Sequence, residues 1–263
     1  MIPQAYITEW SNQVPWRTNE QVEQDLVICR ALVEIFSDPF LSERLAFRGG
    51  TALHKLYLQP QPRYSEDIDL VQITEEPFGP VIDKLRERLA FLGDPVRKQK
   101  EHNNTLVFRF ESEFPPVQRL RLKVETNCRE HFTVLGLKKI PFSVESSWFN
   151  GSCEITTYQL EELLGTKLRA LYQRRKGRDL FDLNKAFISV DNLNVENLIK
   201  CYIEYMKFSV GQPPSQKQFM DNMELKMNDS EFSGDITALI RPTENYNQND
   251  AYNLLKKLID QLP

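Results

Sequence analysis

The sequence predicts an α+β fold in two parts: a mixed sheet with flanking helices over residues 1–157, followed by a helical lobe over residues 158–263. In the first part, apolar and polar residues alternate over short segments, as in strands with one buried face. After residue 157 the apolar residues recur at helical spacing instead. A glycine pair between a short strand and a helix, followed by a strand with alternating aspartates, lies at the centre of the first part.

The first part should begin with an amphipathic helix over residues 21–36, ended by a Ser-Asp-Pro sequence. A short strand over residues 45–48 then leads through a glycine pair into a helix over residues 51–58, which the prolines at 60 and 62 end. The other elements expected here are a strand over 68–73, a helix over 80–92, and strands over 95–100, 105–111, 119–126 and near 153–156.

The second part contains only helical patterns, without an internal repeat or a low-complexity segment. The predicted helices cover residues 158–175, 179–188, 195–208, 214–227 and 249–262.

Composition excludes several classes of protein. No apolar run approaches the roughly 20 residues that span a bilayer, and residues 1–16 lack the basic and apolar blocks of a signal peptide. The four cysteines form no C-x-x-C pair, which argues against a disulfide framework or a zinc site. We therefore expect a cytoplasmic protein without membrane contact. A net charge of −4 argues against a generally basic surface, although it allows a local basic face.

Two aspartates on one predicted strand indicate a metal site. Asp67 and Asp69 are two residues apart, so their side chains should point to the same face. Two carboxylates roughly 6 Å apart repel by about 3 kcal/mol at an effective dielectric constant near 20. A divalent cation such as Mg²⁺, with Mn²⁺ as the alternative ion, would offset this repulsion. Upstream, Gly49 and Gly50 allow a phosphate to approach the backbone, and the helix after them offers free N–H groups. The combination predicts a site for nucleotidyl transfer.

A third carboxylate from a neighbouring strand is expected at a two-metal site. Glu125 lies on the polar side of the strand over 119–126 and is the preferred candidate, with Glu111 as the competitor. Arg121 and Lys123 share that polar side and either contact phosphates or are solvated.

Other polar residues near these motifs are candidates for nucleotide binding. They are Thr51 and Lys55 on the helix after the glycines, and Arg63 and Ser65 before the aspartate strand. His54 is expected at the surface of its helix.

The segment over residues 162–183 is a second candidate region. Lys167 lies on a predicted helix, and Asp179 and Asp182 share a face one turn apart on the next. Residues 169–178 carry five basic side chains that could bind tRNA.

Three stretches of the chain resemble the AbiEii/AbiGii toxin family of nucleotidyltransferases, within the DNA polymerase β-like superfamily. They are Phe47–Leu53 (FRGGTAL), Arg63–Leu70 (RYSEDIDL), and Lys167–Asp182 with its RDxxD ending. The resemblance covers about residues 45–185. Two departures are His54, at a position that is commonly small and polar in the family, and the proline-rich spacer over residues 59–62.

The resemblance implies a bilobal toxin of a bacterial toxin–antitoxin or phage abortive-infection system, with a cognate antitoxin encoded nearby. Members transfer nucleotides to the 3′ end of tRNA, and others bind GTP. It implies that Asp67 and Asp69 bind metal, that Gly49, Gly50 and Ser65 contact the triphosphate, and that Lys167 with Asp182 or Asp179 serves from the helical lobe.

The hypothesis is a Mg²⁺-dependent transfer of a nucleoside monophosphate from a nucleoside triphosphate to RNA, with the tRNA 3′ end as the expected acceptor. Lys167 would neutralise the departing pyrophosphate. Two alternatives stay open at this point: transfer of AMP to a Ser, Thr or Tyr hydroxyl of a protein, and a non-catalytic nucleotide-binding partner of an antitoxin.

Overall fold

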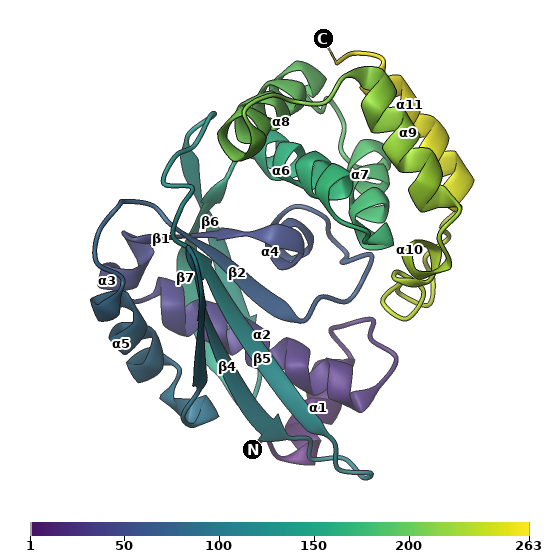
Figure 1. The fold of residues 1–263 in the computed structure, drawn as a ribbon. Helices are drawn as coiled ribbons and strands as arrows, with labels where there is room; N and C mark the ends of the chain where they lie inside the picture. The colour runs from purple at the N-terminus through teal and green to yellow at the C-terminus, as the bar shows by residue number, and fades with distance from the viewer. Residues whose placement is uncertain (1, 263) are drawn as a thin grey trace. The chain divides into compact units, whose positions relative to one another are not determined.

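The computed structural model describes residues 2–262, which form two compact units (Figure 1). The first unit consists of Met1–Leu56, Tyr64–Phe132 and Leu137–Tyr158, and the second of Tyr57–Arg63, Thr133–Gly136 and Gln159–Pro263. The chain therefore enters the second unit in two short segments before its long carboxy-terminal part. A single boundary at residue 157 leaves these two segments out.

The first unit is built on a seven-stranded mixed sheet with the order β3-β4-β5-β2-β1-β7-β6. Strand β2 runs parallel to β5, and β1 runs parallel to β7, while the other neighbours are antiparallel. The predicted α+β class is therefore confirmed. The strands are β1 (Leu45–Arg48), β2 (Asp67–Gln72), β3 (Val96–Lys100), β4 (Asn103–Glu111), β5 (Arg119–Asn127), β6 (Leu137–Glu145) and β7 (Asn150–Tyr158).

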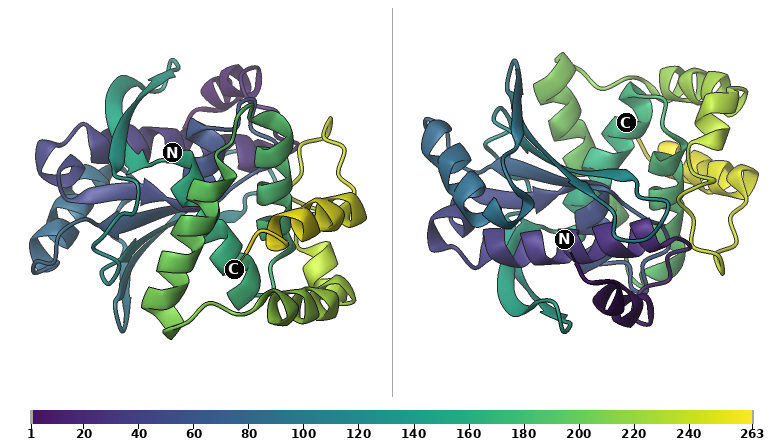
Figure 2. Two further views of the ribbon diagram at one scale, coloured as in Figure 1. Left: turned by 90° about the horizontal axis from the view of Figure 1, so that it is seen from above. Right: turned by 90° about the horizontal axis from the view of Figure 1, so that it is seen from below.

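Helix α2 is the main helix of the first unit, and two further views show it running along the sheet in purple (Figure 2). It begins where Thr18 accepts a hydrogen bond from the backbone of Gln21, and most of its side chains are buried. It contacts β5, β6 and β7, whereas α4 contacts β1 and β2. The helices of this unit are α1 (Gln4–Ser11), α2 (Asn19–Phe36), α3 (Pro39–Ser42), α4 (Gly49–Leu56) and α5 (Gly79–Arg88), with a 3₁₀ turn at Ala90–Leu92.

The sheet has an apolar and a polar face where β2 and β5 pair. Ile68 and Val124 are opposite each other and buried, whereas Asp69 and Glu125, the next pair, are partly exposed. This alternation follows from the period of two along a strand. It places the predicted acidic residues on the polar face.

Strand β6 has no counterpart among the predicted elements. Pro141 interrupts its apolar pattern, and β6 accommodates a proline because it lies at the edge of the sheet. Three short helices, α1, α3 and α10 (Ser230–Gly234), are likewise additions to the prediction.

The second unit is helical, as predicted. Its long helices are α6 (Leu160–Gln173), α7 (Gly177–Ser189), α8 (Val195–Val210), α9 (Gln216–Met227) and α11 (Gln248–Ile259). Over residues 2–262, every helix is too short or too polar to cross a membrane.

A buried carboxylate holds the segment Thr133–Gly136 in the second unit. The side chain of Glu162 on α6 accepts hydrogen bonds from the backbone N–H groups of Val134 and Leu135, at 2.8 and 2.9 Å. It also accepts from the hydroxyls of Thr133 and Tyr205, both at 2.8 Å. These four donors offset the cost of burying the charge.

Helices α6 and α8 approach each other closely at Gly165. A Cβ at this position would lie 2.7 Å from Cβ of Cys201 and 2.9 Å from the carbonyl oxygen of Leu198. We expect Gly165→Ala to lower the free energy of unfolding by about 1–3 kcal/mol, because the two helices must separate. Urea denaturation would measure this change.

Gly234→Ala is the matched control, because a Cβ at that position meets nothing within 4 Å. It should leave the stability unchanged or slightly raised. Equal stability of the two variants would contradict the packing argument.

Candidate functional site

Asp67 and Asp69 lie side by side on the polar face of β2. Asp67 is paired in register with Lys123 of β5, and Asp69 with Glu125. Partial burial, followed by the neighbouring charge of Asp69, raises the pKa of Asp67 to about 6. A bound cation would stabilise the ionised form of this carboxylate, which its surroundings disfavour. The pair therefore provides adjacent hard oxygen ligands, which fit Mg²⁺ or Mn²⁺.

Glu125 is the third carboxylate of this face. Its oxygens accept a hydrogen bond from Asn103 at 3.2 Å and pair with Nζ of Lys123 at 2.5 Å. Glu111, the competing candidate, is paired with Arg119 at the far end of β5. Arg119 is six residues before Glu125, which corresponds to about 20 Å along the strand. Sheet register thus favours Glu125. Within the described residues, no three His, Cys, Asp or Glu side chains are already gathered as a metal cluster.

The glycine turn lies directly against Asp69. Gly49 follows β1 with a φ of +81°, a value that side chains other than glycine rarely adopt. A Cβ at Gly49 would lie 2.1 Å from Oδ2 of Asp69. The turn can therefore approach the carboxylate only because residue 49 has no side chain. Gly50 continues the turn as the second residue of α4.

Two hydroxyls connect the start of α4 to the start of β2. Thr51 donates a hydrogen bond to the carbonyl oxygen of Asp67 at 2.5 Å, and its hydroxyl lies 2.7 Å from that of Ser65. The structure thus brings together five residues of the predicted site: Gly49, Thr51, Ser65, Asp67 and Asp69.

Lys55 and His54, also on α4, have a different environment from the one expected. Nζ of Lys55 donates to Oδ1 of Asp25 at 2.9 Å and to Sγ of Cys29 at 3.1 Å, and its side chain is 4% exposed. This placement argues against a direct phosphate contact for Lys55. The expected surface position of His54 is wrong, because His54 is 0% exposed. Helix α4 has only eight residues, and those from 51 to 55 are all buried.

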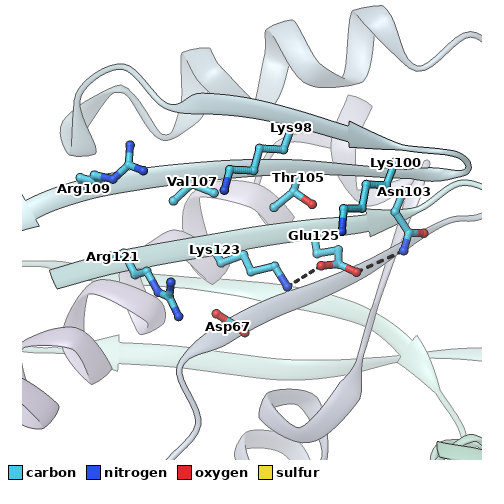
Figure 3. A pocket seen from close by; sticks show the side chains of 10 residues that line it. All are labelled: Asp67, Lys98, Lys100, Asn103, Thr105, Val107, Arg109, Arg121, Lys123 and Glu125. Carbon is cyan, nitrogen blue, oxygen red and sulfur yellow. Dashed lines mark hydrogen bonds and ion pairs between the residues drawn. The ribbon is translucent and has the colours of Figure 1, made fainter. Parts of the chain in front are cut away.

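A basic pocket of about 450 Å³ lies on the same face, beside Asp67 (Figure 3). Its side chains come from β2, β3, β4 and β5, and only Asp67, Arg121, Lys123 and Glu125 among them are candidates predicted from the sequence. The spacing of two between Lys98 and Lys100, and between Val107 and Arg109, was the signal that could have identified the others. The lining residues are Asp67, Lys98, Lys100, Asn103, Thr105, Val107, Arg109, Arg121, Lys123 and Glu125.

The remaining predicted residues form a buried ionic cluster in the second unit. Arg63 donates to both carboxylate oxygens of Asp182, at 2.6 and 2.7 Å. Nζ of Lys167 lies 2.9 Å from Asp182 and 3.1 Å from Asp179. Arg174 also makes two hydrogen bonds to Asp179, at 2.7 and 2.8 Å. The cluster joins α6, α7 and the segment Tyr57–Arg63.

The cations outweigh burial at Asp179. Burial alone would raise the pKa of this carboxyl, but the charges of Lys167 and Arg174 hold it below its usual value. Both Asp179 and Asp182 are 0% exposed. Because Lys167 is bound by two buried carboxylates, its geometry supports a role in holding α6 against α7.

The basic turn over residues 169–178 is largely neutralised within its own unit. Arg175 pairs with Asp229 at 3.4 Å, and Lys176 and Arg178 pair with Asp235 at 3.3 and 3.8 Å. Arg169 lies over the ring of Tyr205, 5.2 Å from its centroid. Arg174, Arg175, Lys176 and Arg178 of this turn therefore each already have an acidic partner in the second unit.

Comparisons with known proteins connect these features to a family. The model of the family described as nucleotidyl transferase AbiEii toxins, type IV toxin–antitoxin system, matches residues 30–254. This match confirms the resemblance that the sequence motifs predict. No curated protein sequence gives a significant match.

Solved structures with the same fold include two nucleotidyltransferases. MenT4, a nucleotidyltransferase toxin of Mycobacterium tuberculosis H37Rv, has 16% identity and a TM-score of 0.67, covering 100% of this chain and 91% of that one. A putative nucleotidyltransferase from H. pylori has 15% identity and a TM-score of 0.53, covering 93% of this chain and 95% of that one. At such identities the likeness shows the fold alone, and it confirms the predicted fold.

The ionic cluster should be essential for stability. We expect Arg63→Met to lower the free energy of unfolding by about 3–5 kcal/mol, because Asp182 loses two charged hydrogen bonds while remaining buried. Chemical denaturation monitored by circular dichroism would measure this loss.

Arg178→Met removes the same charge from a more exposed pair with Asp235 and should cost less than about 1 kcal/mol. If both variants were equally stable, the cluster would not have the stabilising role that its burial indicates.

Proposed function

Because this chain belongs to the family of AbiEii nucleotidyltransferase toxins of type IV toxin–antitoxin systems, we propose that it transfers a nucleoside monophosphate from a nucleoside triphosphate to an RNA acceptor, with the 3′ end of tRNA as the leading candidate. The observation that carries this proposal is the contact between the Gly49 turn and Asp69, beside Asp67. As a toxin of this type, the protein acts in a system that includes an antitoxin.

The first unit supplies the groups that such a transfer needs. The turn at Gly49 and Gly50 exposes backbone N–H groups at the start of α4, where a phosphate is stabilised. Thr51 and Ser65 place two hydroxyls beside the start of β2. We propose that these residues position the triphosphate next to the acidic pair.

Asp67 and Asp69 would hold a divalent cation, with Glu125 as the third carboxylate of the same face. When bound, Mg²⁺ or Mn²⁺ supplies positive charge at the phosphates and favours ionisation of the acceptor hydroxyl. Glu125 is held by Lys123 and Asn103, so its orientation is fixed before any ligand binds. A carboxylate held in this way loses little side-chain entropy on binding.

The protein's contribution is therefore positioning and electrostatics. The acceptor hydroxyl releases its proton to solvent and its oxygen forms a bond to the α-phosphorus. The bond from the α-phosphorus to the α–β bridging oxygen breaks, and pyrophosphate leaves. Asp67 and Asp69 are fixed by a strand that is paired on both sides, with β1 and with β5. Such a rigid support keeps the reacting groups in line.

Asp69 should be essential for transfer. We expect Asp69→Ala and Asp69→Asn to reduce incorporation of labelled nucleotide into RNA by more than about 100-fold, because the charge that holds the cation is lost. The assay combines the purified protein, each of the four triphosphates with Mg²⁺ or Mn²⁺, and total RNA or total protein as acceptor. Toxicity after induction should be lost in parallel.

Asp94→Asn removes a carboxylate that is 99% exposed in the same unit and should behave as the wild type. Wild-type incorporation by both Asp69 variants would reject the proposed site. Label in protein instead of RNA would keep the transferase and reject the RNA acceptor.

The glycine turn provides an independent test. Gly49→Ala should reduce transfer by more than about 10-fold, because the new Cβ displaces Asp69 and the residue must keep a left-handed backbone, at a cost of about 1–2 kcal/mol. Thermal denaturation should show that the variant still folds. Gly79→Ala, where a Cβ meets nothing within 4 Å, is the matched control. Full activity of Gly49→Ala would show that the close approach is not needed.

A further inference from the structure

The polar face of β3, β4 and β5 carries an excess of positive charge. Five of the ten residues that line the pocket are basic and two are acidic, although the whole chain has a net charge of −4. We name the five basic residues the basic track. They are Lys98 and Lys100 on β3, Arg109 on β4, and Arg121 and Lys123 on β5.

The arrangement of these charges opposes the stability of the sheet. Arg109 and Arg121 are directly opposite each other in the register of β4 and β5. Like charges in such a cross-strand pair are destabilising. Within residues 2–262, only Lys123 of the track forms an ion pair, with Glu125 at 2.5 Å. The basic side chains of β3, β4 and β5 therefore form a positively charged face, and such a face fits an anionic ligand.

The order of the strands places the basic track on one side of the two aspartates. Strand β2, with its two aspartates, lies between β1, which leads into the glycine turn, and β5, where the basic track begins. If the triphosphate occupies the turn, the track extends from the opposite side of the aspartates across β5, β4 and β3. Three strand spacings amount to about 14 Å. This is the side from which an acceptor would reach the reacting phosphorus.

We propose that the basic track binds the sugar–phosphate backbone of the nucleic-acid acceptor and directs its 3′ end to Asp67 and Asp69. This inference rests on the proposed nucleotidyl transfer to RNA and assigns the surface that binds the acceptor. It places that surface on the sheet of the first unit, not on the turn over residues 169–178. There, Arg174, Arg175, Lys176 and Arg178 already form ion pairs with Asp179, Asp229 and Asp235.

Protection of an exposed sheet edge explains only part of the track. Lysines on an edge strand prevent pairing with another chain, and β3 is an edge strand. This reason applies to Lys98 and Lys100. It does not apply to Arg109 and Arg121, which lie on the interior strands β4 and β5.

Binding of RNA without nucleotide tests the track separately from transfer. The probes are a fluorescein-labelled single-stranded RNA and a labelled tRNA, titrated with the full chain at several salt concentrations. In the triple variant Lys98→Gln, Arg109→Gln, Arg121→Gln, we expect affinity to fall by at least about 10-fold. The slope of log affinity against log salt should decrease by about 2, at about 0.7 for each of three lost phosphate contacts.

The control triple variant is Arg175→Gln, Lys176→Gln, Arg178→Gln, which removes the same charge and should change affinity less than about 2-fold. Asp69→Ala should bind RNA as well as the wild type, so that loss of transfer is not mistaken for loss of binding. Arg121→Gln alone should keep or raise the melting temperature, because it removes the repulsion with Arg109.

Three results would overturn the inference: wild-type affinity and salt slope in the track variant, an equal or larger loss in the control variant, or no RNA binding by the wild type. If instead the wild type binds RNA through the track but transfers nothing to it, the track stands and the proposed acceptor reaction fails.

Discussion

The structure of the site depends on the close approach between a backbone turn and a carboxylate. The 2.1 Å that would separate a Cβ at Gly49 from Oδ2 of Asp69 leaves no room for any side chain. Because the turn begins α4 and the carboxylate belongs to β2, this approach aligns a set of N–H groups with an acidic pair. Pairing of β2 with both β1 and β5 keeps the alignment rigid. Both proposed roles of the site, phosphate binding and cation binding, therefore depend on one glycine.

Local patterns were sufficient to predict the elements that carry the acidic pair. The strand over 45–48 has the predicted bounds, and the spacing of Asp67 and Asp69 places both on one face. Glu125 was a choice between two glutamates that the sequence could not resolve, because register between β2 and β5 is a property of the assembled sheet. Of the basic track, only Arg121 and Lys123 were singled out from the sequence. Its other members lie on the preceding strands β3 and β4, which pair with β5 in chain order, and their place on the same face depends on the register between these strands.

Burial was the property that sequence patterns predicted least well. His54 was expected at the surface of its helix and Lys55 at the nucleotide, yet both side chains are buried. The charged form of Lys55 is stabilised by Asp25, which lies on α2, 30 residues away in sequence, and accepts a hydrogen bond from Nζ of Lys55. The ionic cluster shows a related effect, since Arg63 joins Asp182 across 119 residues. Partners at such separations leave no local signature.

The helical unit includes two short segments from the first part of the chain, Tyr57–Arg63 and Thr133–Gly136. A fragment starting at residue 159 would lack Arg63, and Asp182 would lose a bidentate partner. It would also lack Val134 and Leu135, whose N–H groups satisfy the carboxylate of Glu162. Asp182 would keep only Lys167 of these partners, and Glu162 only Tyr205, so two buried acidic side chains would each lose most of their donors. The compact helical unit therefore depends for part of its internal hydrogen bonding on residues that precede it in the chain.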